Sequence, residues 1–264
     1  MKETITSLQN CLIKEVVRLK KESYRKKTGI VVIEGEKEVK IAINTNISII
    51  KVIICEKYKF DRSAIPDVPV ENILKISEKL FKKLSKRENP DGIMVLANIK
   101  EKQISDIGIK NDLLLIAVEK IEKPGNLGAI IRSADAAGAD AVFVIDSYLD
   151  IYNPNIIRNS RGSVFSLPVV PIKLVEFIKW VKENDVNIFA ASPHESRNYC
   201  EHDYKNKCAF LLGNEHNGLS KEALKIANNK IKIPMNGEID SLNISVSAAI
   251  LLYEALRQRP SKKT

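Results

Sequence analysis

The sequence has few cysteines and no long apolar run, and both shortages restrict the class of protein that it can encode. Only four cysteines occur in 264 residues, and no two of them form a CxxC pair. No apolar stretch approaches the ~20 residues that a membrane-spanning helix requires. The amphipathic amino-terminal stretch also lacks the apolar centre of a signal peptide. These absences predict a cytoplasmic protein with reduced thiols and no membrane partner.

Familiar ligand signatures are missing as well. The stretch 194–208 contains two histidines and two cysteines, but their spacing does not match that of paired zinc ligands. Neither the GxGxxG fingerprint of dinucleotide-binding sheets nor a Walker phosphate loop is present. The sequence therefore predicts no metal site, and it disfavours a nucleotide-dependent oxidoreductase.

Positive charge is concentrated in the first part of the chain. The formal net charge is +9; residues 1–110 contain 23 Lys and Arg against 15 Asp and Glu, whereas residues 111–264 contain 19 against 18. Such a lopsided basic segment is typical of proteins that contact nucleic acid, although a lysine-rich surface also serves solubility. Charge alone leaves both interpretations open.

Apolar periodicity divides the chain into two α/β regions. In residues 1–108, helix-like stretches alternate with the strands GIVVIEG, IIKVIIC and IMVLANI, which predicts a small α/β domain. In residues 109–264 the alternation is more regular and predicts a mostly parallel sheet with helices on both faces. The polar stretch 106–111 marks the boundary. Within the second region we expect a long polar loop over Tyr152–Gly162 and a strand over Ile231–Ile233.

Three loops at strand ends of the second region carry polar side chains. The first, KPGNLGAIIR, places Asn126 at a helix start and Arg132 further along the helix. The second, FLLGNEHNGLS, places Glu215 just after a buried strand, and the third contributes Ser241 and Asn243 before the last helix. Because ligands bind off the carboxyl ends of parallel strands, these side chains are expected to converge. Taken singly, these loops also have ordinary explanations. The first can be a glycine turn before a core helix, Arg132 can be a surface arginine, and Glu215 can simply cap its loop.

The last helix is apolar almost all round. Asp240 and Ser241 are its candidate caps, and Leu251 belongs to one apolar face. Val246 and Tyr253 lie on the other face. Such a helix is expected to be covered on both sides.

Together, the three loops resemble the motifs of the SpoU (TrmH-type) family of SPOUT RNA 2′-O-ribose methyltransferases. The matching segments, in family order, are NLGAIIRSADAAGADAVFV, LLGNEHNGLS and IPMNGEIDSLNISVSAAILLYEALRQR. With VVIEGEKEV in the first region, the resemblance covers essentially the whole chain. It implies a deep trefoil knot at the carboxyl end, a homodimer and an S-adenosylmethionine site built from the knot loops. The second apolar face of the last helix would then meet the partner subunit.

The resemblance also implies roles for single residues. The catalytic positions are Asn126, Arg132, Glu215, Ser241 and Asn243. The cofactor-binding positions are Ala190, Ala191, Ser192, Leu212, Gly213, Ile233, Met235 and Leu242. Residues 1–108 resemble a ribosomal-protein-like RNA-binding domain. The candidate RNA contacts are Arg25, Lys26 and Lys27, with Arg158 and Arg161 in the later polar loop.

The implied reaction needs help from the protein, because a ribose hydroxyl is a poor nucleophile at neutral pH. Arg132 is expected to stabilise the developing alkoxide or to relay its proton. It is not expected to act as a simple base, because the pKa of arginine is so high that the guanidinium stays protonated. Asn126 and Asn243 would orient it. Ribosomal RNA is the favoured substrate and transfer RNA the alternative. A catalytically silent RNA-binding or ribosome-assembly factor belongs to a different class, and the intact polar positions argue against it.

Overall fold

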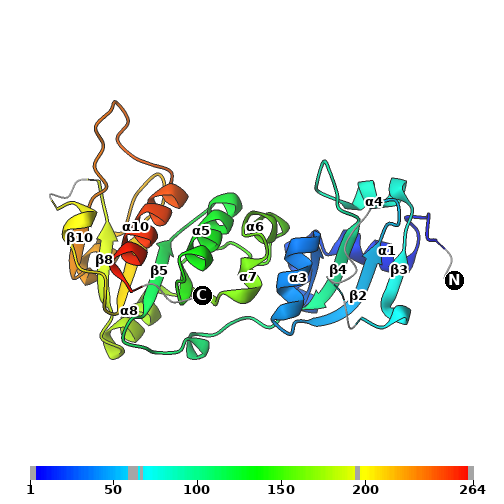
Figure 1. The fold of residues 1–264 in the computed structure, drawn as a ribbon, viewed down its shortest axis with the longest axis horizontal. Coiled ribbons are helices and arrows are strands. Elements are labelled where there is room, and N and C mark those ends of the chain that lie inside the picture. The colour runs from blue at the N-terminus through cyan, green and yellow to red at the C-terminus, as the bar shows by residue number, and fades with distance from the viewer. Residues whose placement is uncertain (1–3, 59–64, 66–67, 194–196, 261–264) are drawn as a thin grey trace. The chain divides into compact units, whose positions relative to one another are not determined.

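The computed structural model consists of two compact units (Figure 1). It describes residues 4–58, 65, 68–193 and 197–260. Unit 1 comprises Met1–Glu101 and Tyr152–Ser166, and unit 2 comprises Lys102–Ile151 and Leu167–Thr264. This grouping differs from the predicted division at 108/109 in one respect above all. The segment Tyr152–Ser166 follows unit 2 elements in the chain, yet it packs with unit 1.

Unit 1 is built on a four-stranded sheet in the order β1-β4-β2-β3. The strands are β1 (Ile30–Glu34), β2 (Ser48–Ile54), β3 (Ile73–Lys75) and β4 (Ile93–Asn98). Strand β4 pairs antiparallel with β1 and β2, whereas β3 pairs parallel with β2. The three apolar runs predicted as strands correspond to β1, β2 and β4. Strand β3 has only three residues, which is too short to give a periodic signal.

Helices cover both faces of this sheet. They are α1 (Cys11–Arg18), α2 (Glu22–Thr28), α3 (Glu36–Asn44), α4 (Glu78–Leu84), α6 (Pro154–Asn159) and α7 (Ser163–Ser166). Val16 of α1 and Leu84 of α4 pack in one apolar cluster with Met94 and Leu96 of β4. Helix α3 contacts β1 and β4. Because alternate residues of a strand face opposite sides and both sides are covered here, β4 is buried from Ile93 to Ala97 and reads as a continuous apolar run.

The predicted loop over Tyr152–Gly162 is wrong, because most of this segment is helical. Asn153 caps α6 by accepting a hydrogen bond from the Asn155 backbone N–H (2.9 Å), and proline occupies the first turn. Ile156 and Ile157 are buried. At Gly162, where φ is +88°, an added Cβ would lie 2.9 Å from the Cα of Glu38 in α3, so glycine permits this close approach.

Unit 2 contains a six-stranded sheet in the order β10-β8-β9-β5-β6-β7, and every pairing in it is parallel. The strands are β5 (Leu114–Glu119), β6 (Ala141–Ile145), β7 (Val169–Ile172), β8 (Asn187–Ala191), β9 (Cys208–Leu212) and β10 (Asn229–Ile231). This confirms the predicted α/β class with a parallel sheet. The last strand is earlier than predicted: β10 pairs with β8 from Asn229 to Ile231, and β8 ends there, so Ile233 has no strand beside it.

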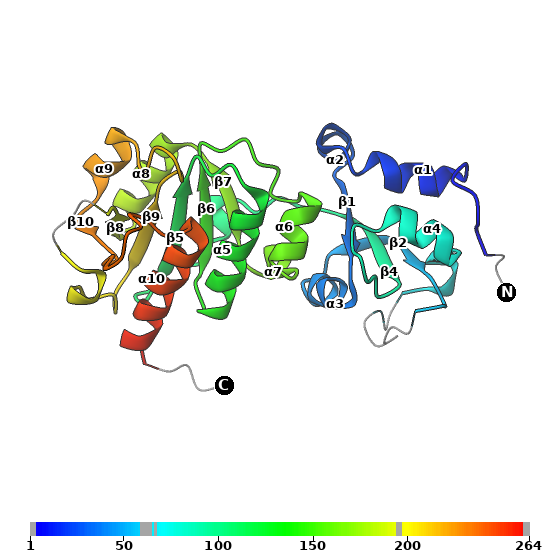
Figure 2. The same cartoon turned by 90° about the horizontal axis from the view of Figure 1, so that it is seen from above.

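Helices lie on both faces of the second sheet, as Figure 2 shows. They are α5 (Pro124–Ala136), α8 (Leu174–Glu183), α9 (Lys221–Ile226) and α10 (Ile244–Gln258). Helices α5 and α10 pack against each other on one face. On the other face, Phe177 of α8 meets Phe143 of β6 edge-on, with ring centroids 5.1 Å apart. Both rings are fully buried and anchor the core of this unit.

Two features are absent from the part of the chain that the structure describes. No helix there is long and apolar enough to cross a membrane. The same residues hold no group of three or more His, Cys, Asp or Glu side chains arranged to bind a metal ion. His194, one of the histidines rejected as a zinc ligand in the sequence, lies outside the described residues.

Arg259 holds the carboxyl end of α10 to the sheet. Its guanidinium donates to the carbonyl oxygens of Tyr204 (2.9 Å), Asn206 (2.9 Å) and Asp112. We expect Arg259→Ala to lower the free energy of unfolding by about 2–3 kcal/mol, because several carbonyls lose a charged donor. Urea denaturation measures this loss. The control is Arg257→Ala, which removes an exposed guanidinium from Glu254 while Gln258 still donates to that carboxylate (2.7 Å). We expect it to change stability by less than about 1 kcal/mol. Equal stability of the two variants would contradict the prediction.

Candidate active site

The carboxyl ends of β8, β9 and β10 lie next to one another, because β8 pairs in parallel with both other strands. These strand ends and the loops after them carry all the predicted cofactor-binding residues. They are Ala190, Ala191, Ser192, Leu212, Gly213, Ile233, Met235 and Leu242. Each of them is buried or half-buried. The parallel sheet thus gathers three separate stretches of sequence at one edge.

In the loop after β10, the backbone N–H and C=O groups have few hydrogen-bond partners among the described residues. Lys232 still donates its N–H to the carbonyl of Arg197 (2.9 Å), but no backbone hydrogen bond joins residues 233–242 to the rest of the described chain. Amides and carbonyls without a protein partner are available to a ligand. The side chains of Met235 and Leu242 in the same loop are half-buried and apolar. Unpaired backbone groups beside an apolar wall fit S-adenosylmethionine, whose adenine and amino-acid ends are hydrogen-bonding groups.

Gly213 lies directly after β9, against the turn that follows it. Asn214 and Gly218 close this turn with two backbone hydrogen bonds of 3.1 and 2.9 Å. A Cβ added to Gly213 would lie 2.1 Å from the carbonyl carbon of Gly218 and 2.2 Å from the nitrogen of Leu219. Only glycine leaves room for backbone at this distance, and the turn therefore depends on it.

Two residues that the sequence analysis missed hold the same turn. Asn214 is buried, and its Nδ2 donates to the carbonyl of Lys120 (2.9 Å) and to Oε1 of Glu122 (3.1 Å). Glu119 ends β5 at 1 % exposure and accepts a hydrogen bond from the Ser220 backbone N–H (2.8 Å). A carboxylate that ends an otherwise apolar strand needs a buried partner, and that pattern in LLIAVE was the available signal.

Three of the predicted catalytic residues form one hydrogen-bonded network. Asn126, in the first turn of α5, donates through Nδ2 to Oε1 of Glu215. Its Oδ1 accepts from Nδ2 of Asn243 at 3.2 Å. Lys123 adds an ammonium group 2.8 Å from Oε2 of Glu215, a contact that the sequence did not suggest. The network joins all three polar loops.

Asn243 is also the cap of α10. Its Oδ1 accepts from the backbone N–H (2.8 Å) and the hydroxyl (2.7 Å) of Ser245, which leaves Nδ2 to reach Asn126. The prediction that Asp240 and Ser241 cap this helix is wrong. The Ser241 hydroxyl instead donates to Oδ1 of Asp240 (3.2 Å) on the exposed surface.

Arg132 stands apart from the network. It is exposed on α5, and no hydrogen bond or ion pair connects it to another residue in the described parts of the chain. Six positions along an α-helix turn through about 600°, so Asn126 and Arg132 leave the helix in different directions. Within one chain, no hydrogen bond among the described residues joins Arg132 to Asn126 or Asn243, so the prediction that these two residues orient Arg132 has no direct contact to support it.

The candidate RNA contacts differ in exposure. Arg25 is only 3 % exposed, and its Nη1 donates to the Leu19 carbonyl at 2.7 Å. Little of this guanidinium is open to a phosphate, so the predicted RNA contact of Arg25 has no support from its burial and stays a prediction. Lys26 and Lys27 are exposed, and Lys26 pairs with Glu22 on the same helix. Arg158 and Arg161, in α6 and just after it, are exposed too.

A parallel sheet whose strand-end loops meet in this way matches a known class of methyltransferase. The model of the SpoU rRNA Methylase family matches residues 113–253, and the chain belongs to this family. Residues 10–95 match the MRM3-like substrate binding domain.

Similar proteins extend the match to nearly the full chain. The 23S rRNA (guanosine(2553)-2′-O)-methyltransferase RlmP of Bacillus subtilis is 31 % identical and covers 94 % of this chain and 97 % of its own. A crystal structure of an RNA 2′-O ribose methyltransferase is 39 % identical, with a TM-score of 0.88, covering 97 % of this chain and 99 % of its own. The AdoMet-bound rRNA methyltransferase from Sinorhizobium meliloti is 29 % identical, with a TM-score of 0.87 and 97 % of both chains covered.

These matches confirm several predictions from the sequence. The family, the separate amino-terminal domain, the class of S-adenosylmethionine-dependent RNA 2′-O-methyltransferase and its cofactor are as expected. The roles of the single site residues stay predictions.

Proposed function

We propose that this protein transfers the methyl group of S-adenosylmethionine to a ribose 2′-hydroxyl of ribosomal RNA. The observation that carries the proposal is the network of Asn126, Glu215 and Asn243. Glu215 and Asn243 lie on the loops after β9 and β10, which also hold predicted cofactor-binding residues. Ribosomal RNA is favoured because RlmP, named for a 23S rRNA reaction, is similar along both regions of the chain.

The chemistry divides between cofactor and protein. When bound, S-adenosylmethionine supplies an electrophilic methyl group on a sulfonium sulfur. The chain must hold the ribose in line with that methyl group and stabilise negative charge on the 2′-oxygen as its proton leaves. Asn126 is fixed at both ends of its amide, by Glu215 and Asn243, so it can position the ribose without reorganising. Arg132 supplies the positive charge that stabilises the developing alkoxide.

A homodimer is part of the proposal. Helix α10 exposes three large apolar side chains on the side away from the sheet: Val246 (45 % exposed), Tyr253 (50 %) and Leu256 (38 %). An apolar face at helical spacing suits a self-complementary interface. In a dimer, Arg132 could act in the active site of the partner subunit. This would account for its lack of a bond to any described residue of its own chain. The trefoil knot and the cytoplasmic location remain predictions from the sequence.

The test of the proposed function is transfer of labelled methyl from S-adenosylmethionine to unmodified ribosomal and transfer RNA, followed by mapping of alkali-resistant ribose positions. We expect a 2′-O-methyl site in ribosomal RNA. Methylation of transfer RNA alone would show that transfer RNA, and not ribosomal RNA, is the substrate. Cofactor binding without transfer to either RNA would favour a silent RNA-binding factor and overturn the proposal.

Asn243 serves both stability and the network, and two variants separate these roles. We expect Asn243→Ala to lower the free energy of unfolding by about 1 kcal/mol through loss of the cap, whereas Asn243→Ser keeps a capping oxygen. Both variants remove the amide Nδ2 that donates to Asn126, and the shorter serine side chain does not replace it, so both are expected to slow methyl transfer at least about tenfold. Thermal unfolding and single-turnover rates measure the two effects. Full activity in Asn243→Ser would remove Asn243 from the catalytic residues.

A further inference from the structure

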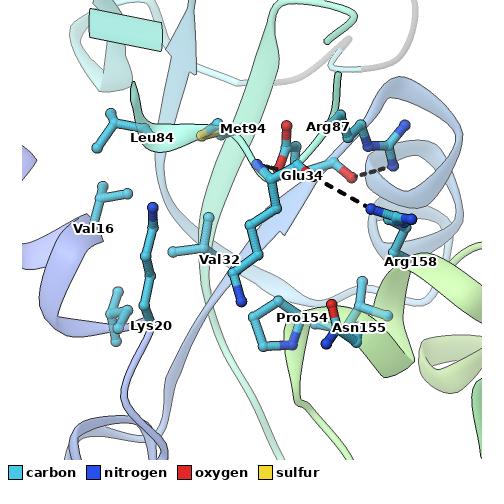
Figure 3. A pocket seen from close by; sticks show the side chains of 13 residues that line it. Val16, Lys20, Val32, Glu34, Leu84, Arg87, Met94, Pro154, Asn155 and Arg158 are labelled. Carbon is cyan, nitrogen blue, oxygen red and sulfur yellow. Dashed lines mark hydrogen bonds between the residues drawn. The ribbon is translucent and has the colours of Figure 1, made fainter. Parts of the chain in front are cut away.

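Unit 1 contains a pocket with an apolar floor (Figure 3). Val16 of α1, Val32 of β1, Leu84 of α4 and Met94 of β4 form the floor, and Pro154 of α6 adds to the wall. The walls thus come from the stretch that matches the substrate binding domain and from a segment inside the stretch that matches the methylase family. The pocket contains none of the catalytic or cofactor-binding residues described above.

The rim of the pocket is basic. Lys20 and Arg158 stand on opposite sides of it. Lys86 lines both this pocket and a second hollow. The second hollow shares Lys86, Arg87 and Arg158 with the first. It adds Arg161 together with the carboxylates of Glu38 and the exposed Glu88, so its cations outnumber its carboxylates by four to two. The two hollows therefore form a continuous surface, apolar in one part and cationic in the other.

Buried pairs fix the shape of this rim. Arg87 donates to the carbonyl of Glu34 (2.8 Å) and forms an ion pair with the buried carboxylate of Glu38 (2.9 Å). The side chain of Glu34 accepts from the hydroxyl of Ser85 and from the backbone N–H of Lys86 (3.1 Å). The carboxylates of Glu34 and Glu38 are thus occupied in holding the loop that carries Lys86.

Four cationic side chains that line the two hollows have no carboxylate partner among the described residues. In the described residues, no salt bridge neutralises Lys20, Lys86, Arg158 or Arg161, and Arg158 makes only a 3.3 Å bond to the Lys86 carbonyl. Burial lowers the pKa of Lys20, and the charge of Lys86 lowers it further, although Glu34 acts in the opposite direction. In the apolar floor beside them Val16, Leu84 and Met94 are buried and Val32 is half-buried. Two ammonium groups that repel each other beside such a surface favour an anion between them.

We propose that this pocket binds one unpaired nucleotide of the RNA substrate, with the base on the apolar floor and its phosphates at Lys20, Lys86 and Arg158. The inference rests on the proposed function for the identity of RNA as the substrate. An apolar floor suits the face of any base, and the cations recognise the backbone without reading sequence. A paired base is stacked inside its helix and cannot reach the floor, so the nucleotide must be unpaired.

The methionines give a direct test on the full chain, because there are only three of them, at positions 1, 94 and 235. With 13C-methyl methionine, Met94 reports on the pocket and Met235 on the predicted cofactor site. Adding a single-stranded hexanucleotide should shift the Met94 resonance and leave Met235 in place, and S-adenosylmethionine should shift Met235 alone. A duplex of equal length should leave Met94 unshifted. Met94→Leu assigns the signal.

Charge variants test the rim. The double variant Lys20→Ala with Arg158→Ala should weaken single-strand binding about tenfold. It should also flatten the salt dependence of log K by about 0.7 for each phosphate that the protein no longer neutralises. Lys14→Ala, which removes a charge from the exposed face of α1, is the control and should retain more than half of the affinity.

The outcomes separate this proposal from the proposed function. If single-stranded RNA leaves Met94 unshifted while methyl transfer proceeds, the pocket assignment is overturned and the function stands. If Met94 responds to RNA but no methyl is transferred to any RNA, the function fails and the pocket stands. If the duplex shifts the Met94 resonance as much as the single strand does, the proposal that the nucleotide is unpaired is overturned. If a hexaglutamate peptide shifts it equally, the pocket binds an acidic peptide and the RNA proposal is overturned.

Discussion

Arg132→Ala is expected to slow methyl transfer by about 10²–10³-fold, the cost of removing one group that stabilises a developing oxyanion. The variant should fold normally, because Arg132 is exposed and bonds to no other described residue. Affinity for S-adenosylmethionine should also persist, since the predicted cofactor-binding residues lie at the ends of β8, β9 and β10. Single-turnover transfer and cofactor titration, run on the same preparation, measure both.

Two further variants sharpen this test. Arg132→Lys keeps the charge but not the guanidinium fork, so partial recovery would assign the effect to charge and no recovery to geometry. Lys179→Ala removes a charge from the exposed side of α8 and should leave the rate within twofold of wild type. Wild-type activity in Arg132→Ala would reject the proposed role of this residue.

Mixing two inactive variants shows which protomer Arg132 serves. In the proposed homodimer, random pairing of Arg132→Ala with Asn126→Ala chains gives mixed dimers in which one site is intact if Arg132 acts across the interface. We expect recovery of about a quarter of the wild-type sites in that case. No recovery would place Arg132 in the site of its own chain.

Gly213→Ala is expected to disable the protein by a different route. The added methyl group would lie 2.1 and 2.2 Å from backbone atoms of Gly218 and Leu219, and backbone cannot rotate away as a flexible side chain can. The turn must open, which displaces Glu215 from Asn126 and alters the loop after β9. We expect a loss of about 3 kcal/mol in unfolding free energy and at least about 100-fold weaker binding of S-adenosylmethionine.

The matched control for this change is Gly108→Ala, where an added Cβ has no atom within 4 Å. It should leave both stability and cofactor affinity near wild type. Chemical denaturation and calorimetric titration compare the two variants directly. Normal cofactor binding by Gly213→Ala would mean that the turn adapts to a side chain and that its tight closure is not required.

The sequence predicted the fold through its apolar runs. Strands such as LLIAVE and AVFVI are buried on both faces, so their composition alone marks a parallel sheet. The predicted loop over Tyr152–Gly162 failed because α6 has only six residues and a single buried pair, Ile156 and Ile157. The Asn-Pro pair at the start of this helix is the sequence signal that indicates it.

Within the candidate site, the sequence identified residue types better than partners. Asn126, Glu215 and Asn243 could be selected because they lie at strand–helix junctions of one predicted sheet and match catalytic positions of the family that the sequence resembles. Their connection, and the participation of Lys123, depend on distances that no spacing rule contains. Arg25 shows what a basic run leaves undetermined: its guanidinium is buried against the Leu19 carbonyl, whereas Lys26 and Lys27 beside it are exposed. Charge runs record composition, whereas burial depends on which face of a helix is covered.

The chain passes between the two units three times, at 101/102, 151/152 and 166/167, because Tyr152–Ser166 packs with unit 1. A fragment that begins at 109 would retain α6 and α7 without their packing partner, and Ile156 and Ile157 would face water. The two halves are therefore poor candidates for exchange by simple gene fusion. An ancestor that gained a new amino-terminal domain would also have needed a surface to receive this segment, so the two regions are expected to be inherited as a matched pair.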